Sequence, residues 1–176
     1  AAGGLRMMAS GLVPELTLEA ARMASLGAGA KLIGQFSFEL TEDDLDAIRA
    51  QKPDIFLLAG GTDGGNTSCI LHNARMLASL KPDFPIIVAG NRTAARECMR
   101  ILSDCHAQLC ENVMPRFGVL KTEQTQAAIR DIFLGRIIQA KGLDKAARMM
   151  NDILMPTPAA VLSALELLSG GCESES

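Results

Sequence analysis

Two hydrophobic patterns recur along the chain, one typical of strands and one typical of helices. Continuous apolar runs in "DIFLLAG" (54–60) and "FPIIVAGN" (84–91) predict short strands that are buried on both faces. A weaker run, "HAQLCENVM" (106–114), predicts another strand. The segment 30–40 alternates Leu32, Gly34, Phe36, Phe38 and Leu40 with polar partners, which predicts a further strand.

Helical patterns separate these strands. "LTLEAARMASLGAG" (16–29) predicts a helix with Thr17 as its N-cap. Thr41, with Asp44 three residues later, is typical of a capping box at the start of "EDDLDAIRAQK". Apolar residues at helical spacing predict two more helices, over 67–81 and 92–105. Strands and helices in this rhythm predict an α/β fold, a Rossmann-like, flavodoxin-like parallel sheet of about four strands with helices on both faces.

From residue 122 the pattern becomes helical only. A long amphipathic helix is predicted to stop at Gly142, and two shorter helices are predicted over 143–155 and from Thr157 onward. We expect an α/β domain over 1–121 and C-terminal helices over 122–176, packed on or beside it as one continuous domain. The chain begins without methionine and ends in "LSGGCESES", so we expect it to be a fragment of a longer protein.

Composition excludes several classes of function. The net charge of -3 without clustered Lys or Arg argues against a nucleic-acid partner. No run reaches the roughly 18 to 20 apolar residues of a membrane span, and no signal peptide is recognisable, which favours the cytoplasm. The 5 cysteines form no CxxC pair and only 2 histidines accompany them, so we expect no metal site and no disulfide framework. Most of these cysteines are interpreted as small buried hydrophobes.

The stretch "IFLLAGGTDGGNTSC" (55–69) places four glycines directly after a buried strand. Its glycine spacing resembles a P-loop, but Asn66 stands where the lysine is needed, and GxGxxG is not matched. In open α/β sheets ligands lie beyond the carboxyl ends of the strands, where three loops of this chain are expected to converge. The candidate ligand-binding residues are Gly60, Gly61, Thr62, Asp63, Gly64, Gly65, Asn66, Gly90, Asn91, Glu111 and Asn112.

An equally simple interpretation is structural. These loops can be tight strand-to-helix turns in which Asp63, Asn66 and Asn91 bind local main-chain donors. His72 and His106 are isolated, and no nucleophile stands at a readable spacing from a base, so no catalytic residue is predicted.

Six motifs, in one order over nearly the whole chain, resemble the glutamate mutase accessory proteins, also called MutL-type reactivating factors. They are "AAGGLRM" (1–7), "LLAGGTDGGN" (57–66), "LHNARMLA" (71–78), "VAGN" (88–91), "ENVMP" (111–115) and "MPTPAAVL" (155–162).

This resemblance implies an ATP-dependent factor of the actin and Hsp70-like superfamily. Such a factor reactivates a coenzyme-B12-dependent mutase, such as glutamate mutase or ornithine aminomutase, by letting damaged cobalamin leave. The two phosphate loops of that superfamily are not found in this sequence. The chain is therefore expected to be a central segment that binds a mutase subunit and holds no cofactor itself, whereas the full-length protein is expected to use ATP and Mg²⁺.

Two further hypotheses remain open at this point. The chain could be a stand-alone domain that binds a small molecule, either cobalamin or a nucleotide, although no Asp-x-His-x-x-Gly loop is present to ligate cobalamin. It could also be a spacer or dimerisation unit, and an oligomer is compatible with the sequence. In that case Met7, Met8, Met149 and Met150 would form an adaptable contact surface, unless they cover the core instead.

Overall fold

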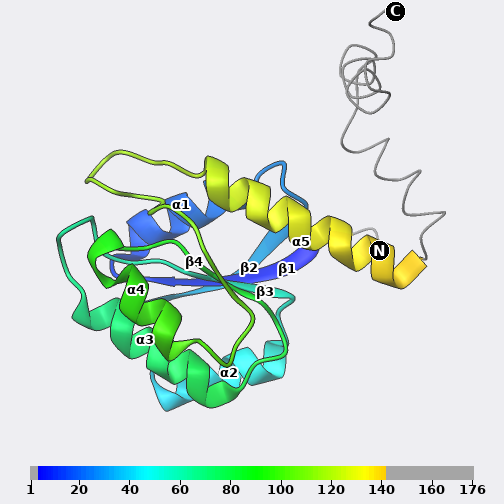
Figure 1. The fold of residues 1–176 in the computed structure, drawn as a ribbon, viewed down its shortest axis with the longest axis horizontal. Helices are drawn as coiled ribbons and strands as arrows, with labels where there is room; N and C mark the ends of the chain where they lie inside the picture. Colours follow the sequence, from blue (N-terminus) through cyan, green and yellow to red (C-terminus); the bar gives the residue numbers. More distant parts are fainter. Residues whose placement is uncertain (1–3, 142–176) are drawn as a thin grey trace, which may run out of the picture. The chain divides into compact units, whose positions relative to one another are not determined.

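The fold is a parallel sheet between two layers of helices, as Figure 1 shows for a computed structural model that describes residues 4–141. The strands are β1 (Leu5–Gly11), β2 (Ala30–Ser37), β3 (Ile55–Leu58), β4 (Ile86–Val88) and β5 (Ala107–Leu109). The helices are α1 (Pro14–Ser25), α2 (Glu42–Gln51), α3 (Ser68–Leu80), α4 (Arg92–Ile101) and α5 (Glu123–Lys141). The sheet, its helices and α5 as far as Phe133 belong to one compact unit.

All neighbouring strands in the sheet are parallel, and their order is β2-β1-β3-β4-β5. The predicted α/β fold is confirmed, but the sheet has 5 strands where about four were expected. The strand that the sequence did not reveal is β1, which lies between β2 and β3. Because β1 is covered on both sides, Met7 (0% exposed) and Met8 (3% exposed) are core residues, and the contact surface suggested for them is wrong.

Each face of the sheet carries its own hydrophobic core. On one face, α1 and the first half of α5 cover Met7, Ala9, Ile55 and Leu57. On the other face, α2, α3 and α4 cover Met8, Phe56, Leu58, Ile86 and Val88. Neighbouring residues of each strand thus enter opposite cores, which explains why these strands read as unbroken apolar runs.

The predicted alternation along β2 is interrupted by a bulge. Met7 pairs with Leu32, but the next residue, Met8, pairs with Gly34, so Ile33 is the extra residue. Leu32 accordingly packs in the core on the α1 side, whereas Phe36 packs in the core on the α2 side. A bulge changes which face a strand's side chains meet, so the simple alternation predicted over 30–40 is wrong.

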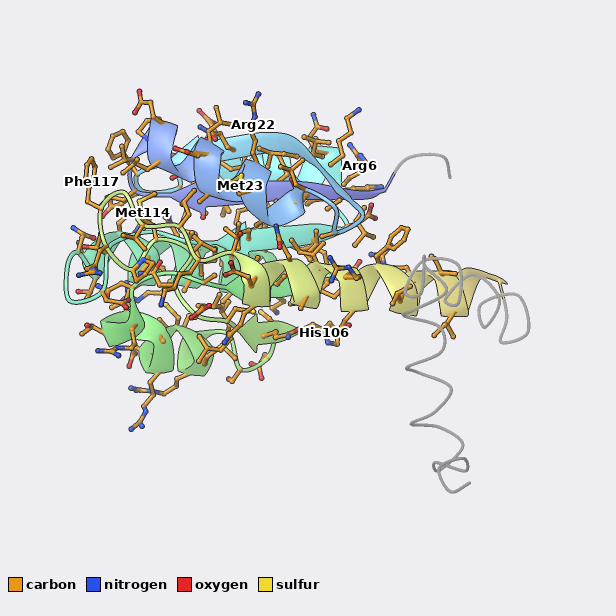
Figure 2. The ribbon with its side chains drawn as sticks, turned by 90° about the horizontal axis from the view of Figure 1, so that it is seen from above. Arg6, Arg22, Met23, His106, Met114 and Phe117 are labelled. Carbon is orange, nitrogen blue, oxygen red and sulfur yellow. The ribbon has the colours of Figure 1, made fainter. Side chains whose placement is uncertain are left out.

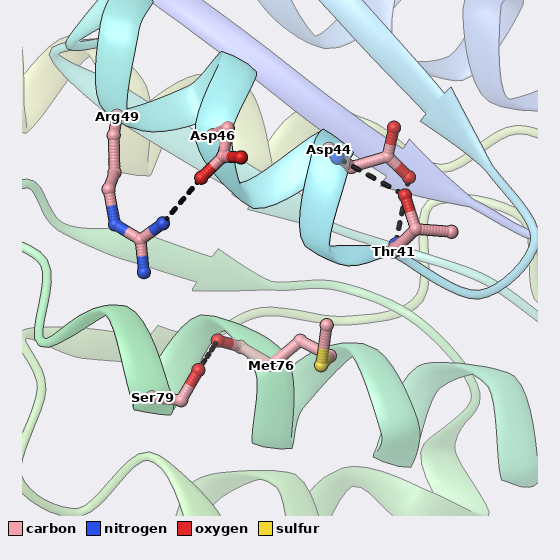
Figure 3. A network of polar contacts seen from close by, with 6 residues as sticks. All are labelled: Thr41, Asp44, Asp46, Arg49, Met76 and Ser79. Carbon is pink, nitrogen blue, oxygen red and sulfur yellow. Dashed lines mark hydrogen bonds and ion pairs between the residues drawn. The ribbon is translucent and has the colours of Figure 1, made fainter.

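The helix starts were predicted with mixed success. The capping box of α2 is confirmed, because Asp44 N–H donates to Thr41 Oγ1 (3.2 Å) and Thr41 N–H donates to Asp44 Oδ2 (2.9 Å; Figure 3). Thr17 is not the N-cap of α1, which begins at Pro14 after an N-cap residue, Val13, that makes no side-chain cap. Thr17 instead packs against Gly11, where an added Cβ would lie 1.9 Å from its Oγ1.

The C-terminal predictions fall partly outside the described residues. The helix predicted from residue 122 is present as α5 up to Lys141. The two helices predicted beyond Gly142, together with Met149, Met150 and Cys172, lie outside the part that the structure describes. The division of the chain at residue 121 therefore stays a prediction. None of the helices within residues 4–141 is long and apolar enough to cross a membrane.

Candidate functional site

The glycine loop between β3 and α3 needs its glycines for conformation and for close approach. Gly60, Gly61 and Gly64 have φ values of 136°, 80° and 80°, which side chains rarely tolerate. A Cβ on Gly61 would also lie 2.5 Å from the carbonyl oxygen of Asn66. On the neighbouring loop, a Cβ on Gly90 would lie 2.8 Å from the carbonyl oxygen of Gly60. Glycine therefore lets the loops that follow β3 and β4 pack directly against each other.

Asn91, at the end of β4, ties these two loops together through its side-chain amide. Its Oδ1 accepts from Gly64 N–H (3.0 Å) and from Thr93 N–H (2.9 Å). Its Nδ2 donates to the carbonyl oxygens of Gly65 (3.0 Å) and Asn66 (2.9 Å). The side chain caps α4 and is 0% exposed, so it is a structural clamp with no free polar group directed at a ligand.

Asn112, after β5, provides a second clamp. Its Nδ2 donates to Gly61 O (3.0 Å) and to Asp63 Oδ1 (3.0 Å), and its Oδ1 accepts from Met114 N–H (3.0 Å). Asp63 Oδ1 also accepts from Arg92 N–H (2.8 Å), while Asp63 N–H donates to Pro115 O (2.9 Å). The loops after β3, β4 and β5 thus meet at one edge of the sheet, as predicted.

Acceptors of the chain itself bind the first two N–H groups of α4 and one N–H group in the first turn of α3. At α3, Asn66 Oδ1 accepts from Cys69 N–H (3.0 Å). At α4, Asp63 and Asn91 accept from the first two main-chain N–H groups, and the Asp63 carboxylate supplies the negative charge that the helix dipole favours. A phosphate at the start of α4 would have to displace these groups, and at α3, the helix that follows the glycine loop, Asn66 stands where a P-loop has its lysine.

The remaining predicted residues lie at the same edge without forming a polar cluster. Thr62 accepts from Gly65 N–H through its carbonyl oxygen (2.9 Å), which closes a tight turn. Glu111 is exposed, and its N–H donates to Gln124 Oε1 (2.9 Å). The structural interpretation of Asp63, Asn66 and Asn91 therefore accounts for their side chains. Ligand binding by this set stays a prediction.

A pocket of about 450 Å³ opens beside the clamped loops, at the carboxyl ends of the neighbouring strands β1 and β3. The chain leaves β1 toward β2 on one side of the sheet and leaves β3 toward β4 on the other side. This is the topological switch point of the sheet, the place where open α/β folds bind ligands. Its walls come from the start of α1, the glycine loop and the segment after β5, and Figure 2 shows Met114 and Phe117 at this end of the molecule. Residues in the walls that the sequence did not indicate are Leu12, Val13, Glu15, Leu16, Thr17, Ala20, Ala59, Val113, Met114 and Phe117.

A second hollow of about 410 Å³ lies on the other side of the clamps. It carries two basic residues, Arg92 and Lys121, and two acidic residues, Asp63 and Glu111. The N–H of Arg92 is already bound by Asp63. The opposed charges favour no single class of ion, and among the described residues no group of three or more His, Cys, Asp or Glu could hold a metal ion.

Comparison with known proteins identifies the family. The family model described as MutL protein matches residues 1–176. The chain belongs to the MutL family. Protein MutL of Clostridium tetanomorphum is 48% identical over an alignment of 177 positions, which covers 99% of this chain and 38% of the relative. The family expected from the six motifs is thus confirmed, and the chain spans about two fifths of the length of this curated relative.

Solved structures of similar shape show the fold alone. The signal receiver domain of the response regulator NarL from Mycobacterium tuberculosis has a TM-score of 0.50 at 14% identity, covering 76% of this chain and 99% of that domain. The receiver domain of a diguanylate cyclase from Desulfovibrio desulfuricans G20 has a TM-score of 0.46 at 12% identity, covering 76% and 97%. The first of these agrees with the flavodoxin-like sheet.

In this MutL-family chain, side chains of the motif "LHNARMLA" also form hydrogen bonds with the main chain of another segment. His72 Nε2 lies 2.9 Å from the carbonyl oxygen of Leu40. Asn73, which is 0% exposed, accepts from Leu40 N–H (2.8 Å) and donates to Phe38 O (3.1 Å). Both residues therefore fix the segment between β2 and α2.

The described cysteines are packing residues with weakened acidity. Cys69, Cys98 and Cys110 are buried and Cys105 is half-buried. Burial, reinforced by the neighbouring Glu97, raises the pKa of the Cys98 thiol to about 11. Burial also raises the pKa of the other three thiols. A thiol with a raised pKa is almost fully protonated at neutral pH, which makes it a poor nucleophile and a poor metal ligand.

Proposed function

We propose that this chain is the central segment of an ATP-dependent reactivating factor for a coenzyme-B12-dependent mutase and that it acts through protein contact. Membership of the MutL family is the observation that carries this proposal. The relative is much longer than the matched region, so the remaining polypeptide has room for the nucleotide-binding parts. Glutamate mutase and ornithine aminomutase are the two candidate partners.

The site geometry supports a division of labour within the full-length protein. Asp63 and Asn91 already bind the first two N–H groups of α4, and the glycine loop before α3 has Asn66 in place of the P-loop lysine. ATP and Mg²⁺ are therefore assigned to the rest of the polypeptide. The alternative that this chain is a stand-alone nucleotide-binding domain is weakened, because its glycine loop supplies no lysine to pair with phosphate.

Competition in a reactivation assay tests the proposal. A mutase carrying damaged cobalamin is mixed with intact adenosylcobalamin, ATP, Mg²⁺ and the full-length factor, and recovery of mutase activity is followed. The isolated 176-residue chain should neither reactivate the mutase nor hydrolyse ATP. Added in excess, it should slow reactivation by occupying the mutase, whereas an equal concentration of a receiver domain of similar fold should have no effect.

Two results would count against this assignment. Rapid ATP hydrolysis by the isolated chain would place nucleotide chemistry in this segment and not in the rest of the polypeptide. Full-length factor that neither binds nor reactivates either mutase would remove the proposed partner. Direct association is measured by isothermal titration calorimetry with each mutase subunit in turn.

A further inference from the structure

The pocket at the switch point remains unexplained by the proposed contact with a mutase. Its floor is formed by the buried residues Ala20, Ala59 and Val113, and its mouth carries Val13 and Phe117, which are 37% and 80% exposed. Small-molecule sites typically have volumes of roughly 300 to 1,000 Å³ and mostly apolar walls. The volume of about 450 Å³ falls within this range.

The pocket is held open by the loops that surround it. Alanine and glycine at positions 20, 59, 60 and 61 leave space that larger side chains would fill. Asn112 lies in the wall and is bonded to Gly61 O, which fixes the distance between the glycine loop and the segment after β5. A cavity whose walls are bonded to one another needs little rearrangement to accept a ligand, which lowers the cost of binding.

The polar groups in the pocket discriminate by charge. Among the described residues, the main-chain N–H groups of Gly61 and Thr62 have no acceptor. They can orient a hydrogen-bond acceptor on a ligand. Glu15 is the one charged residue in the wall, and its carboxylate forms no ion pair within residues 4–141. No Lys or Arg lines the pocket, so an anionic ligand would meet repulsion without a compensating cation.

We propose that this pocket binds a compact apolar organic molecule, neutral or singly cationic, that carries a hydrogen-bond acceptor or an amine, and that it rejects carboxylates and phosphates. This inference is independent of the mutase contact, because it depends only on the cavity and its walls. Apolar surface supplies the affinity, the amides of the glycine loop orient the ligand, and Glu15 favours a positive charge at the mouth.

A series of three naphthalene compounds that differ in charge tests the proposal. 2-Naphthylmethanol, 2-naphthylmethylamine and 2-naphthoate are titrated into the ¹⁵N-labelled chain, and amide chemical shifts are followed by NMR. The amine and the alcohol should shift the Gly61 and Thr62 signals saturably, with dissociation constants on the order of 1 mM for probes of this size. Naphthoate should bind at least tenfold more weakly, a difference of about 1.4 kcal/mol.

Matched variants on α1 locate the site. Leu16→Trp fills the pocket and should abolish the shifts, whereas Leu18→Trp, on the same helix but outside the wall, should leave them unchanged. Glu15→Gln should weaken the amine by about two- to fivefold, as expected for an exposed charge, and leave the alcohol unchanged. Glu19→Gln, one turn farther along, is the control for the loss of a negative charge.

Three outcomes would overturn the proposal. One is the absence of saturable shifts with any of the probes. Another is equal binding of naphthoate and the alcohol. The third is binding that survives in Leu16→Trp while the spectrum shows a folded chain. If the probes fail but a mutase subunit shifts the same amides, the pocket receives a protein side chain and the small-molecule assignment is wrong.

Discussion

Replacing Asn91 by alanine removes four hydrogen bonds, three of which join the loops after β3 and β4. One of them is the N-cap of α4, and the other three bind the main chain of Gly64, Gly65 and Asn66. If the clamp holds the carboxyl edge together, the variant should lose more stability than the loss of a helix cap alone explains.

The size of the effect follows from these bonds. A hydrogen bond contributes about 1 kcal/mol net to stability, so four set an upper value of about 4 kcal/mol. Gly64, Gly65 and Asn66 are exposed, and water can reach their freed groups. We therefore expect Asn91→Ala to lower the free energy of unfolding by about 2 to 3 kcal/mol. Losing the cap alone would cost about 1 kcal/mol.

Two further substitutions separate capping from clamping. Asn91→Ser keeps an acceptor for the α4 cap and should cost about 1 to 2 kcal/mol, less than alanine. Asn91→Asp also keeps an excellent cap but places a carboxylate oxygen against the carbonyl oxygens of Gly65 and Asn66. Since a carboxylate cannot donate, this variant should be at least as unstable as the alanine variant at pH 7.

Urea unfolding followed by circular dichroism at 222 nm measures all three variants. Tryptophan fluorescence is no alternative, since the chain contains neither Trp nor Tyr. The aspartate variant distinguishes a clamp from an ordinary helix cap, because aspartate caps helices as well as asparagine does. Stability of Asn91→Asp equal to or above that of the unmodified chain would refute the clamp and leave Asn91 as an ordinary cap.

Three other predictions use the same reasoning at other positions. Thr41→Ala removes the capping box of α2 and should cost about 1 kcal/mol in urea unfolding, and an unchanged midpoint would contradict it. Gly64→Ala should lower the free energy of unfolding by about 1 to 2 kcal/mol, because alanine is strained at the positive φ of this position. Gly61→Ala, at the same φ, should cost at least about 1 kcal/mol more, because its Cβ would lie 2.5 Å from Asn66 O. Iodoacetamide labelling at pH 9, read by mass spectrometry, should modify half-buried Cys105 before Cys98, whose raised pKa keeps its thiol protonated until about pH 11; equal rates would refute this.

The strands that the sequence revealed are those with strong β-forming residues between clear turn signals. Ile55–Leu58 and Ile86–Val88 are apolar and follow Asp and Pro, and each lies inside the segment predicted for it, with ends that differ by one to three residues. β1 escaped because "LRMMASG" contains no β-branched residue and no alternation. A strand buried on both faces gives no period-two signal, so its sequence does not distinguish it from part of a helix.

Because the sequence did not reveal β1, it could not predict the pocket either. The switch point exists because β1 lies between β2 and β3, and a sheet of four strands without β1 has no such place there. Pro14 gave a usable signal, since proline is favoured at the first position of a helix, and it places the start of α1 at the carboxyl end of the preceding strand. Thr17, three residues later, is a preferred N-cap type but is used in packing against Gly11.

The motif asparagines show why the sequence could not separate ligand contacts from clamps. Asn73, Asn91 and Asn112 each accept a main-chain N–H and donate to a main-chain carbonyl of a neighbouring segment. The asparagine amide carries an acceptor oxygen and an NH₂ donor on separate atoms, whereas ionised aspartate has no donor and serine has a single O–H on its one oxygen. A ligand with a donor and an acceptor would also be bound well by an asparagine in such a loop. An asparagine that binds a ligand and one that binds main chain therefore look the same in the sequence.

What distinguishes the two cases is whether the bonds of the amide are already complete. At Asn91 they are, whereas Gly61 and Thr62, which line the cavity, have main-chain N–H groups without an acceptor among the described residues. Recognition at this edge therefore depends on main chain that the asparagines hold in place, and changes to the clamps should alter ligand binding through loop position. Asn112→Ala should accordingly weaken the naphthylmethanol probe and the naphthylmethylamine probe by the same factor, because the clamp sets the shape of the pocket and contributes no charge to it.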